Sequence, residues 1–170
     1  MKATELLDLL RQFRKDKLAM KRRHEEAATY VSDYDFNNTY QYVIAREEMH
    51  VAWATDAVID VSSAAGQPDP ALDDAPGPAI TVQGKGAAAQ TSVMSQDRDG
   101  AQAFVDKWRP LIASMTHARH RIMLNVILGE TLEHKRFFEQ ALAGRTDLLG
   151  RRADGAGTGG GVLPIRWIEQ

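Results

Sequence analysis

Two short segments of this sequence place a glutamate and a histidine one helical turn apart among apolar residues. Glu47 and His50 lie in AREEMHVAW, and Glu130 and His134, with Glu133 beside them, lie in GETLEHKRFF. Such a pair occupies neighbouring positions on one face of a helix, so its two side chains can bind one ion. A carboxylate oxygen together with an imidazole nitrogen suits iron, manganese or zinc. The sequence therefore predicts a metal site built from two helices.

The apolar periodicity of both segments directs these residues toward a core. At about 100° per residue, Glu47 falls in the middle of the apolar stripe of a helix over residues 38–64. Glu130 and His134 fall on the stripe of a second helix, which Gly144 is well suited to end. Burying an ionised carboxylate is costly unless the carboxylate is paired or bound to a metal. We therefore expect a cation beside each buried carboxylate.

A third histidine is expected at the same height in the fold. A helix over roughly residues 3–30 carries an apolar stripe that two polar residues interrupt, Lys17 and His24. Lys17 is expected to extend from an edge of the stripe into solvent. If this helix and the next form a hairpin that turns near residues 35–36, His24 faces Glu47.

The candidate metal ligands are therefore Glu47, His50, Glu130, His134, Glu133 and His24. Simpler explanations stay open for each of them. Glu25 could replace His24, which could also be an ordinary core histidine. Glu47 and His50 could form a boundary pair with Lys or Arg, and Glu133 could pair with a neighbouring basic residue. His117 and His120 are spaced to bind a metal but suit a partly solvated face.

The chain divides into four parts. Residues 1–65 predict a helical hairpin, and residues 66–99, rich in Pro, Gly and Asp, predict a flexible crossover. Residues 100–150 predict either two helices or one long helix kinked near Pro110. Residues 151–170 form a Gly-rich tail that ends in an apolar peptide.

Together these motifs resemble the ferritin-like superfamily, the di-iron carboxylate bundles that include rubrerythrins and ferritins. The resemblance rests on Glu47-x-x-His50, on the segment EHKRF at 133–137, and on two helical blocks joined by a long crossover. It implies an all-α, ferritin-like antiparallel four-helix bundle with a long connection between its second and third helices. It also implies two iron ions per site, with manganese or zinc as alternatives, and Fe(II) oxidation by O2 or peroxide in iron handling or oxidative-stress defence.

The sequence also departs from the pattern of that superfamily. Residues 100–129 contain no glutamate, and the second motif reads Glu130-x-x-x-His134. The site could therefore be asymmetric, bind one metal such as zinc or manganese, be completed across a dimer, or be inactive. In the last case the protein would be a non-catalytic helical interaction protein.

Composition limits the compartments and partners we expect. The 170 residues include no cysteine and carry a net charge of −2. Thiolate chemistry is thereby excluded, and a nucleic-acid partner is not expected. The N-terminus does not have the pattern of a signal peptide, and no apolar run approaches the roughly 18 residues of a membrane span, so we expect a cytoplasmic protein. By resemblance it would be a homo-oligomer.

The C-terminal peptide VLPIRWIEQ, residues 162–170, is unusually apolar for the end of a Gly-rich tether. It is either a disordered end or a peptide that docks on a protein partner. Its layout is similar to the C-terminal peptides of ferritin-like proteins packaged inside encapsulin shells, although its sequence differs from theirs.

Overall fold

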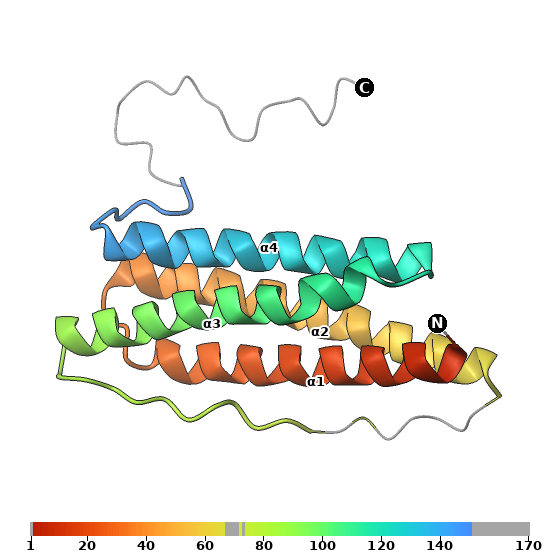
Figure 1. Ribbon diagram of the computed structural model, residues 1–170. Coiled ribbons are helices and arrows are strands. Elements are labelled where there is room, and N and C mark those ends of the chain that lie inside the picture. The colour runs from red at the N-terminus through yellow and green to blue at the C-terminus, as the bar shows by residue number, and fades with distance from the viewer. Residues whose placement is uncertain (1, 67–71, 73, 151–170) are drawn as a thin grey trace.

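The computed structural model describes residues 2–66, 72 and 74–150. Every regular secondary-structure element in this part of the chain is a helix. The four helices are α1 (Ala3–Ala28), α2 (Tyr34–Ala64), α3 (Ala87–Ala113) and α4 (Ala118–Leu142). They lie side by side, with α1 packed along α2 and α3 along α4 (Figure 1). The prediction of an all-α four-helix structure is confirmed. The predictions for residues 151–170 lie outside the described residues.

The hairpin of α1 and α2 forms where the sequence predicted it, but α2 begins earlier. Asp33 is the N-cap residue of α2, and its carboxylate accepts hydrogen bonds from the backbone N–H groups of Asp35 and Phe36 at 3.0 and 3.1 Å. This cap satisfies two N–H groups that would otherwise lack partners. The turn residues SDYDFNN therefore contribute the first turn of α2, which was expected to begin near residue 38.

The apolar core consists of two clusters. One contains Phe13 of α1, Val58 of α2 and Trp108 of α3, and the other contains Tyr40 of α2, Val93 of α3 and Phe138 of α4. Each fully buried large apolar side chain contributes about 1.5–3 kcal/mol to folding. Fully buried polar residues lie in the same helices between these clusters: Lys17, His24, Glu47, His50, Asp97, Thr131 and His134.

The connection between α2 and α3 is shorter than the sequence predicted. The crossover was expected to reach residue 99, but α3 begins at Ala87. Val93, Asp97, Ala101 and Phe104 are all buried and follow the helical period. The buried Asp97 interrupts this apolar stripe, which is why the sequence did not reveal the start of the helix. Residues 114–117 separate α3 from α4, so residues 100–143 form parts of two helices rather than one.

The described part of this connection lies along α1 (Figure 1). The Arg22 guanidinium donates a hydrogen bond of 2.7 Å to the carbonyl oxygen of Ala75. Gly77 approaches α1 so closely that an added Cβ would lie 2.9 Å from the backbone nitrogen of Arg23. The Arg22 hydrogen bond therefore holds the connection against α1, and the close approach requires glycine at position 77 because there is no room for a side chain. No helix among the described residues is long and apolar enough to span a membrane.

Gly77→Ala should therefore lower the free energy of unfolding by about 1–3 kcal/mol, because the added methyl group forces backbone atoms apart. Urea unfolding followed by circular dichroism measures this change. Gly129→Ala is the matched control, because a Cβ on Gly129 meets no atom within 4 Å. In the middle of a helix that substitution should stabilise the protein by up to about 1 kcal/mol. Equal unfolding midpoints for the Gly77 variant and the unsubstituted protein would contradict the close contact.

Candidate metal centre

Glu47 of α2 is the centre of the buried polar cluster, and none of its surface is exposed. Its Oε2 lies 2.7 Å from Nδ1 of His24 on α1. Its Oε1 accepts a hydrogen bond of 2.8 Å from the Lys17 ammonium, also on α1. The contact between His24 and Glu47 that the hairpin predicted is thus confirmed. The expectation that Lys17 extends into solvent is wrong.

Lys17 is fully buried, and all three of its ammonium hydrogens have acceptors. Besides Glu47, its Nζ lies 3.1 Å from Oγ1 of Thr131 and 3.4 Å from Sδ of Met20. It also lies 5.1 Å from the ring centroid of Phe104, a distance suited to a cation–π interaction. The sequence contained the signal for this burial, because Lys17 is seven residues before His24 and therefore on the same face of α1.

Asp97 of α3 extends the cluster on the far side of His24. Its two carboxylate oxygens accept hydrogen bonds of 2.6 Å from the Tyr40 hydroxyl and from Nε of Arg23. Its Oδ1 also lies 3.9 Å from Nε2 of His24, so the His24 ring is held between two carboxylates. Sequence reasoning missed Asp97 because residues 66–99 were expected to form a flexible crossover.

Glu130 of α4 lies at the edge of the cluster rather than in the core, and 22% of its side chain is exposed. Its Oε2 lies 2.8 Å from Nε2 of the fully buried His50. Arg46 donates hydrogen bonds to the same carboxylate from Nε at 2.9 Å and from Nη2 at 2.6 Å. This bidentate contact neutralises Glu130 and fixes its orientation.

His134 of α4 is buried, and neither of its ring nitrogens has a hydrogen-bond partner. Its Nδ1 lies 3.9 Å from Oε1 of Glu47. Its ring stacks on that of His50 at a centroid distance of 6.1 Å, and Nδ1 of His50 also lacks a partner. Buried polar atoms are seldom left without partners, so these three nitrogens need an explanation. Glu133, by contrast, is exposed.

The charges of the cluster follow from burial and from these contacts. Burial alone would raise the pKa of Glu47, but the nearby His24 and Lys17 charges lower it far below its usual value. Burial lowers the pKa of His24, but the Glu47 carboxylate outweighs it and raises the pKa above its usual value. His24 and Glu47 therefore form a charged pair.

The pKa values of the two stacked histidines, His50 and His134, are shifted in the opposite direction from that of His24. Burial, reinforced by the Lys17 charge, lowers the pKa of His50 to about 4 despite its contact with Glu130. Burial likewise lowers the pKa of His134 to about 3, although Glu47 opposes the shift. Both imidazoles are therefore neutral at pH 7. A neutral imidazole with an unpartnered ring nitrogen is the form that binds a metal ion.

One pair of donor atoms in the cluster has the spacing of ligands that share a metal ion. Donors that share an ion at about 2.1 Å lie roughly 3–4 Å apart, and the 3.9 Å between His134 and Glu47 falls in this range. His24 is already held by two carboxylates. In the described part of the chain, no group of three or more His, Asp or Glu side chains is already arranged to hold a metal. Binding therefore requires side-chain rotation near the Lys17 ammonium.

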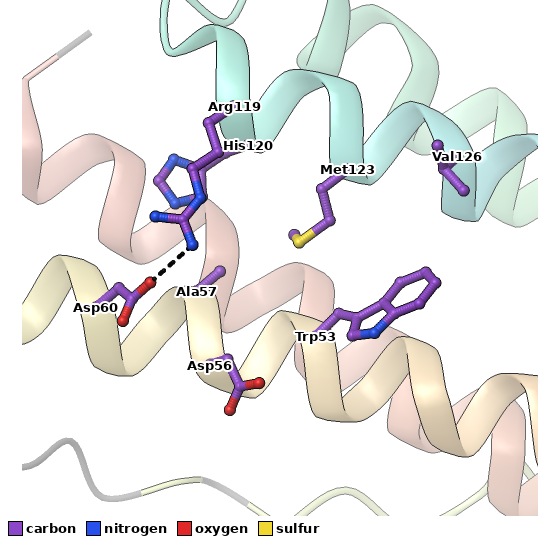
Figure 2. A pocket seen from close by; sticks show the side chains of 8 residues that line it. All are labelled: Trp53, Asp56, Ala57, Asp60, Arg119, His120, Met123 and Val126. Carbon is purple, nitrogen blue, oxygen red and sulfur yellow. Dashed lines mark ion pairs between the residues drawn. The ribbon is translucent and has the colours of Figure 1, made fainter.

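His120 lines a separate pocket of about 380 Å³ between α2 and α4, together with Trp53, Asp56, Asp60 and Met123 (Figure 2). In Figure 2 the Asp60 carboxylate points toward Arg119, and the two form an ion pair at 3.3 Å. The ring of Trp53 lies 5.7 Å from that of His50 and so stands between this pocket and the buried cluster. His117 is exposed, with its ring 6.2 Å from that of His120.

Comparisons with protein-family models, with curated proteins and with solved structures found no match to this chain. The description of this protein therefore rests on its own structure: it is a four-helix protein with a buried cluster of Lys, Glu and His side chains.

The Lys17–Glu47 contact generates a first prediction for the cluster. Lys17→Met or Glu47→Gln alone should each cost about 3–5 kcal/mol of stability, because each leaves a buried charge without its partner. The double variant should cost clearly less than the sum of the two. Urea unfolding at pH 7 measures all three. Lys135→Met is the control, because Lys135 forms a partly exposed pair with Glu139 at 3.1 Å and should lose at most about 0.5 kcal/mol. If the loss of stability in the double variant equals the sum of the losses in the two single variants, a direct Lys17–Glu47 interaction is contradicted.

A second prediction concerns pH. The unfolded chain binds protons at His50 and His134 near pH 6.5, whereas the folded protein binds them only near pH 4 and 3. Stability from these two residues is therefore complete above about pH 6.5 and falls by up to about 1.4 kcal/mol per pH unit per histidine as the pH drops. Urea unfolding between pH 7 and 4 measures the slope, and His134→Phe should make it shallower. An unchanged slope in that variant would contradict a neutral, buried His134.

Proposed function

We propose that the buried cluster binds a redox-active divalent metal ion, with iron as the first candidate, between Glu47, His50, Glu130 and His134. The observation that carries the proposal is the pair of stacked, neutral histidines near two carboxylates, because three of their four buried ring nitrogens lack hydrogen-bond partners. A set of two imidazoles and two carboxylates suits iron, manganese or zinc.

The remaining residues of the cluster would orient these ligands. His24 and Lys17 hold the two oxygens of Glu47, and Arg46 holds Glu130 with two donors. Such outer partners fix the direction of a ligand and adjust its charge. Lys17 also adds a positive charge, which disfavours a second divalent ion. We therefore propose one ion per chain, with a di-iron site as the alternative.

A bound iron would supply one-electron redox chemistry with O2 or peroxide. The proposed activity is Fe(II) oxidation in iron handling or in defence against oxidants. A ferritin-like bundle is supported by four helices of 25–31 residues and by α2 and α3 running in the same direction, which requires the connection to cross the length of the bundle (Figure 1). Membership of that superfamily and assembly into a homo-oligomer remain proposals.

One observation favours a second candidate function. The Lys17 ammonium already contacts Glu47 at 2.8 Å, so the buried carboxylate has a cation without any metal. In this alternative the cluster is a metal-free ionic core, and the chain is a helical interaction protein.

Metal titration under anaerobic conditions tests the proposal. Calorimetry with Fe(II), Mn(II) and Zn(II) should show one ion bound per chain, and His134→Phe should abolish the binding because it removes a ligand while keeping a ring. Glu133→Gln is the control and should bind as the unsubstituted protein does, because Glu133 is exposed. Adding O2 to the Fe(II)-loaded protein should then oxidise the iron faster than in the His134→Phe variant.

Lys17→Met separates the two candidates. If the cluster binds a metal, removing the ammonium should raise metal affinity, since the ammonium repels a cation at the same carboxylate oxygen. In a metal-free ionic core, neither the unsubstituted protein nor this variant binds an ion more tightly than His134→Phe does. That result would sink the metal proposal.

A further inference from the structure

The pocket between α2 and α4 that Figure 2 shows is part of a larger exposed apolar surface. Its volume is about 380 Å³, and Trp53, Met123 and Val126 form its apolar walls. Val126 is 45% exposed, and Ile122, one turn before it on α4, is 63% exposed. Met49, one turn before Trp53 on α2, is 45% exposed. Neighbouring exposed apolar side chains of this kind mark a surface on which another molecule binds.

Two carboxylates of α2 lie beside these apolar walls and give the pocket a charge pattern. Asp60 forms an ion pair with Arg119 of α4 at 3.3 Å. Asp56, one turn earlier, is exposed and lines the same pocket. Its carboxylate forms no ion pair or hydrogen bond with another residue in the described part of the chain. The pocket therefore matches a molecule that carries large apolar groups around one positive charge.

One segment of this chain has that composition. It is the peptide VLPIRWIEQ, residues 162–170, which lies outside the described residues. The positive charge of Arg166 is surrounded in the sequence by four large apolar side chains, those of Leu163, Ile165, Trp167 and Ile168. Glu169 follows three residues after Arg166 and supplies a negative charge that suits Arg119.

Residues 151–161 are long enough to bring this peptide to the pocket. Leu148 lies beside Tyr34 at the start of α2, so the described chain stops near the C-terminal end of α4. Met123 is 19 residues before Leu142, the last residue of α4, which is about 29 Å along the helix at 1.5 Å per residue. The eleven residues 151–161 cover up to roughly 36–40 Å when extended.

The same tether makes docking within one chain favourable. A short Gly-rich linker holds the peptide that it carries at an effective concentration on the order of millimolar. A contact too weak to form between separate molecules at micromolar concentration is therefore populated within the chain.

We propose that residues 162–170 dock in the pocket between α2 and α4 of their own chain, with Arg166 beside Asp56. The chain arrives from the C-terminal end of α4, so the first residues of the peptide lie nearest that end. Glu169 then lies near Arg119, at the N-terminal end of α4. This docking does not depend on a metal ion in the buried cluster.

Disulfide cross-linking in the full-length protein tests the docking, because the chain contains no cysteine. Ile122→Cys places one thiol beside the pocket, and Gly161→Cys places the other directly before the peptide. Oxidation should join them within one chain, giving a monomer on a non-reducing gel. Trp167→Ser should slow this cross-link about tenfold, because it removes the largest apolar side chain of the peptide. The control pair is Lys15→Cys with Gly161→Cys, because Lys15 is exposed on α1. This pair should react more slowly and be unaffected by Trp167→Ser.

An exchange of charges tests the contact between Asp56 and Arg166. Asp56→Arg and Arg166→Asp should each slow the cross-link between positions 122 and 161 several-fold, because each places like charges together. The double variant should restore the rate. Asp106→Arg is the control, because it reverses an exposed carboxylate on α3 and should leave the rate unchanged.

The possible results separate this docking from the alternatives. Equal rates for the two cysteine pairs, or no effect of Trp167→Ser, would overturn the proposal and leave the peptide free for a different protein. A cross-link that joins two chains and speeds up with protein concentration would overturn it by assigning the peptide to a second copy. Failure of the double charge variant to restore the rate would overturn the Asp56–Arg166 contact. None of these rates depends on bound iron, so the docking and the proposed function can fail separately.

Discussion

The three-way contact of Lys17, Glu47 and His24 is the constraint on which the rest of the structure depends. A carboxylate with no exposed surface is tolerated only because an ammonium and an imidazolium each hold one of its oxygens at 2.7–2.8 Å. Each of these cations is held in turn, Lys17 by Thr131 of α4 and His24 by the proximity of Asp97 on α3. All four helices therefore contribute to the environment of one carboxylate.

This arrangement separates the cluster into two chemically different halves. On the α1 and α3 side the groups are charged and paired, with Arg23 and Tyr40 completing the partners of Asp97. On the α2 and α4 side, His50 and His134 are neutral and have unpartnered nitrogens. Low dielectric causes both behaviours, because burial without a strong partner favours the neutral form and burial with one favours the ion pair. Among these residues, only those of the second half have ring nitrogens without hydrogen-bond partners.

Periodicity predicted those parts of the site where sequence neighbours share one face. It placed Glu47 and His134 in the core, and the hairpin between α1 and α2 brought His24 to Glu47, because a short turn fixes the register of two helices. Asp97 was not predictable in the same way. Its relation to His24 depends on a long connection whose length and path do not follow from local spacing.

Lys17 and Glu130 show a different limit. Lysine usually reaches solvent, so the position of Lys17 on the apolar stripe did not outweigh the expectation of an exposed ammonium. Its burial depends on Thr131 and Glu47 from two other helices. Glu130 lies at the boundary because Arg46 reaches it from α2, and which side chains meet across α2 and α4 is decided by tertiary packing.

The cluster lies between two apolar regions that contain no buried ion pair of comparable extent among the described residues. Apolar side chains can exchange neighbours at modest cost, so an all-apolar bundle tolerates several relative heights of its helices. Moving any one helix here by a single turn, about 5.4 Å, would leave Glu47, Asp97 or Lys17 facing an apolar side chain. The buried charges thus fix the axial position of each helix relative to the other three. They do so whether or not an ion binds beside them.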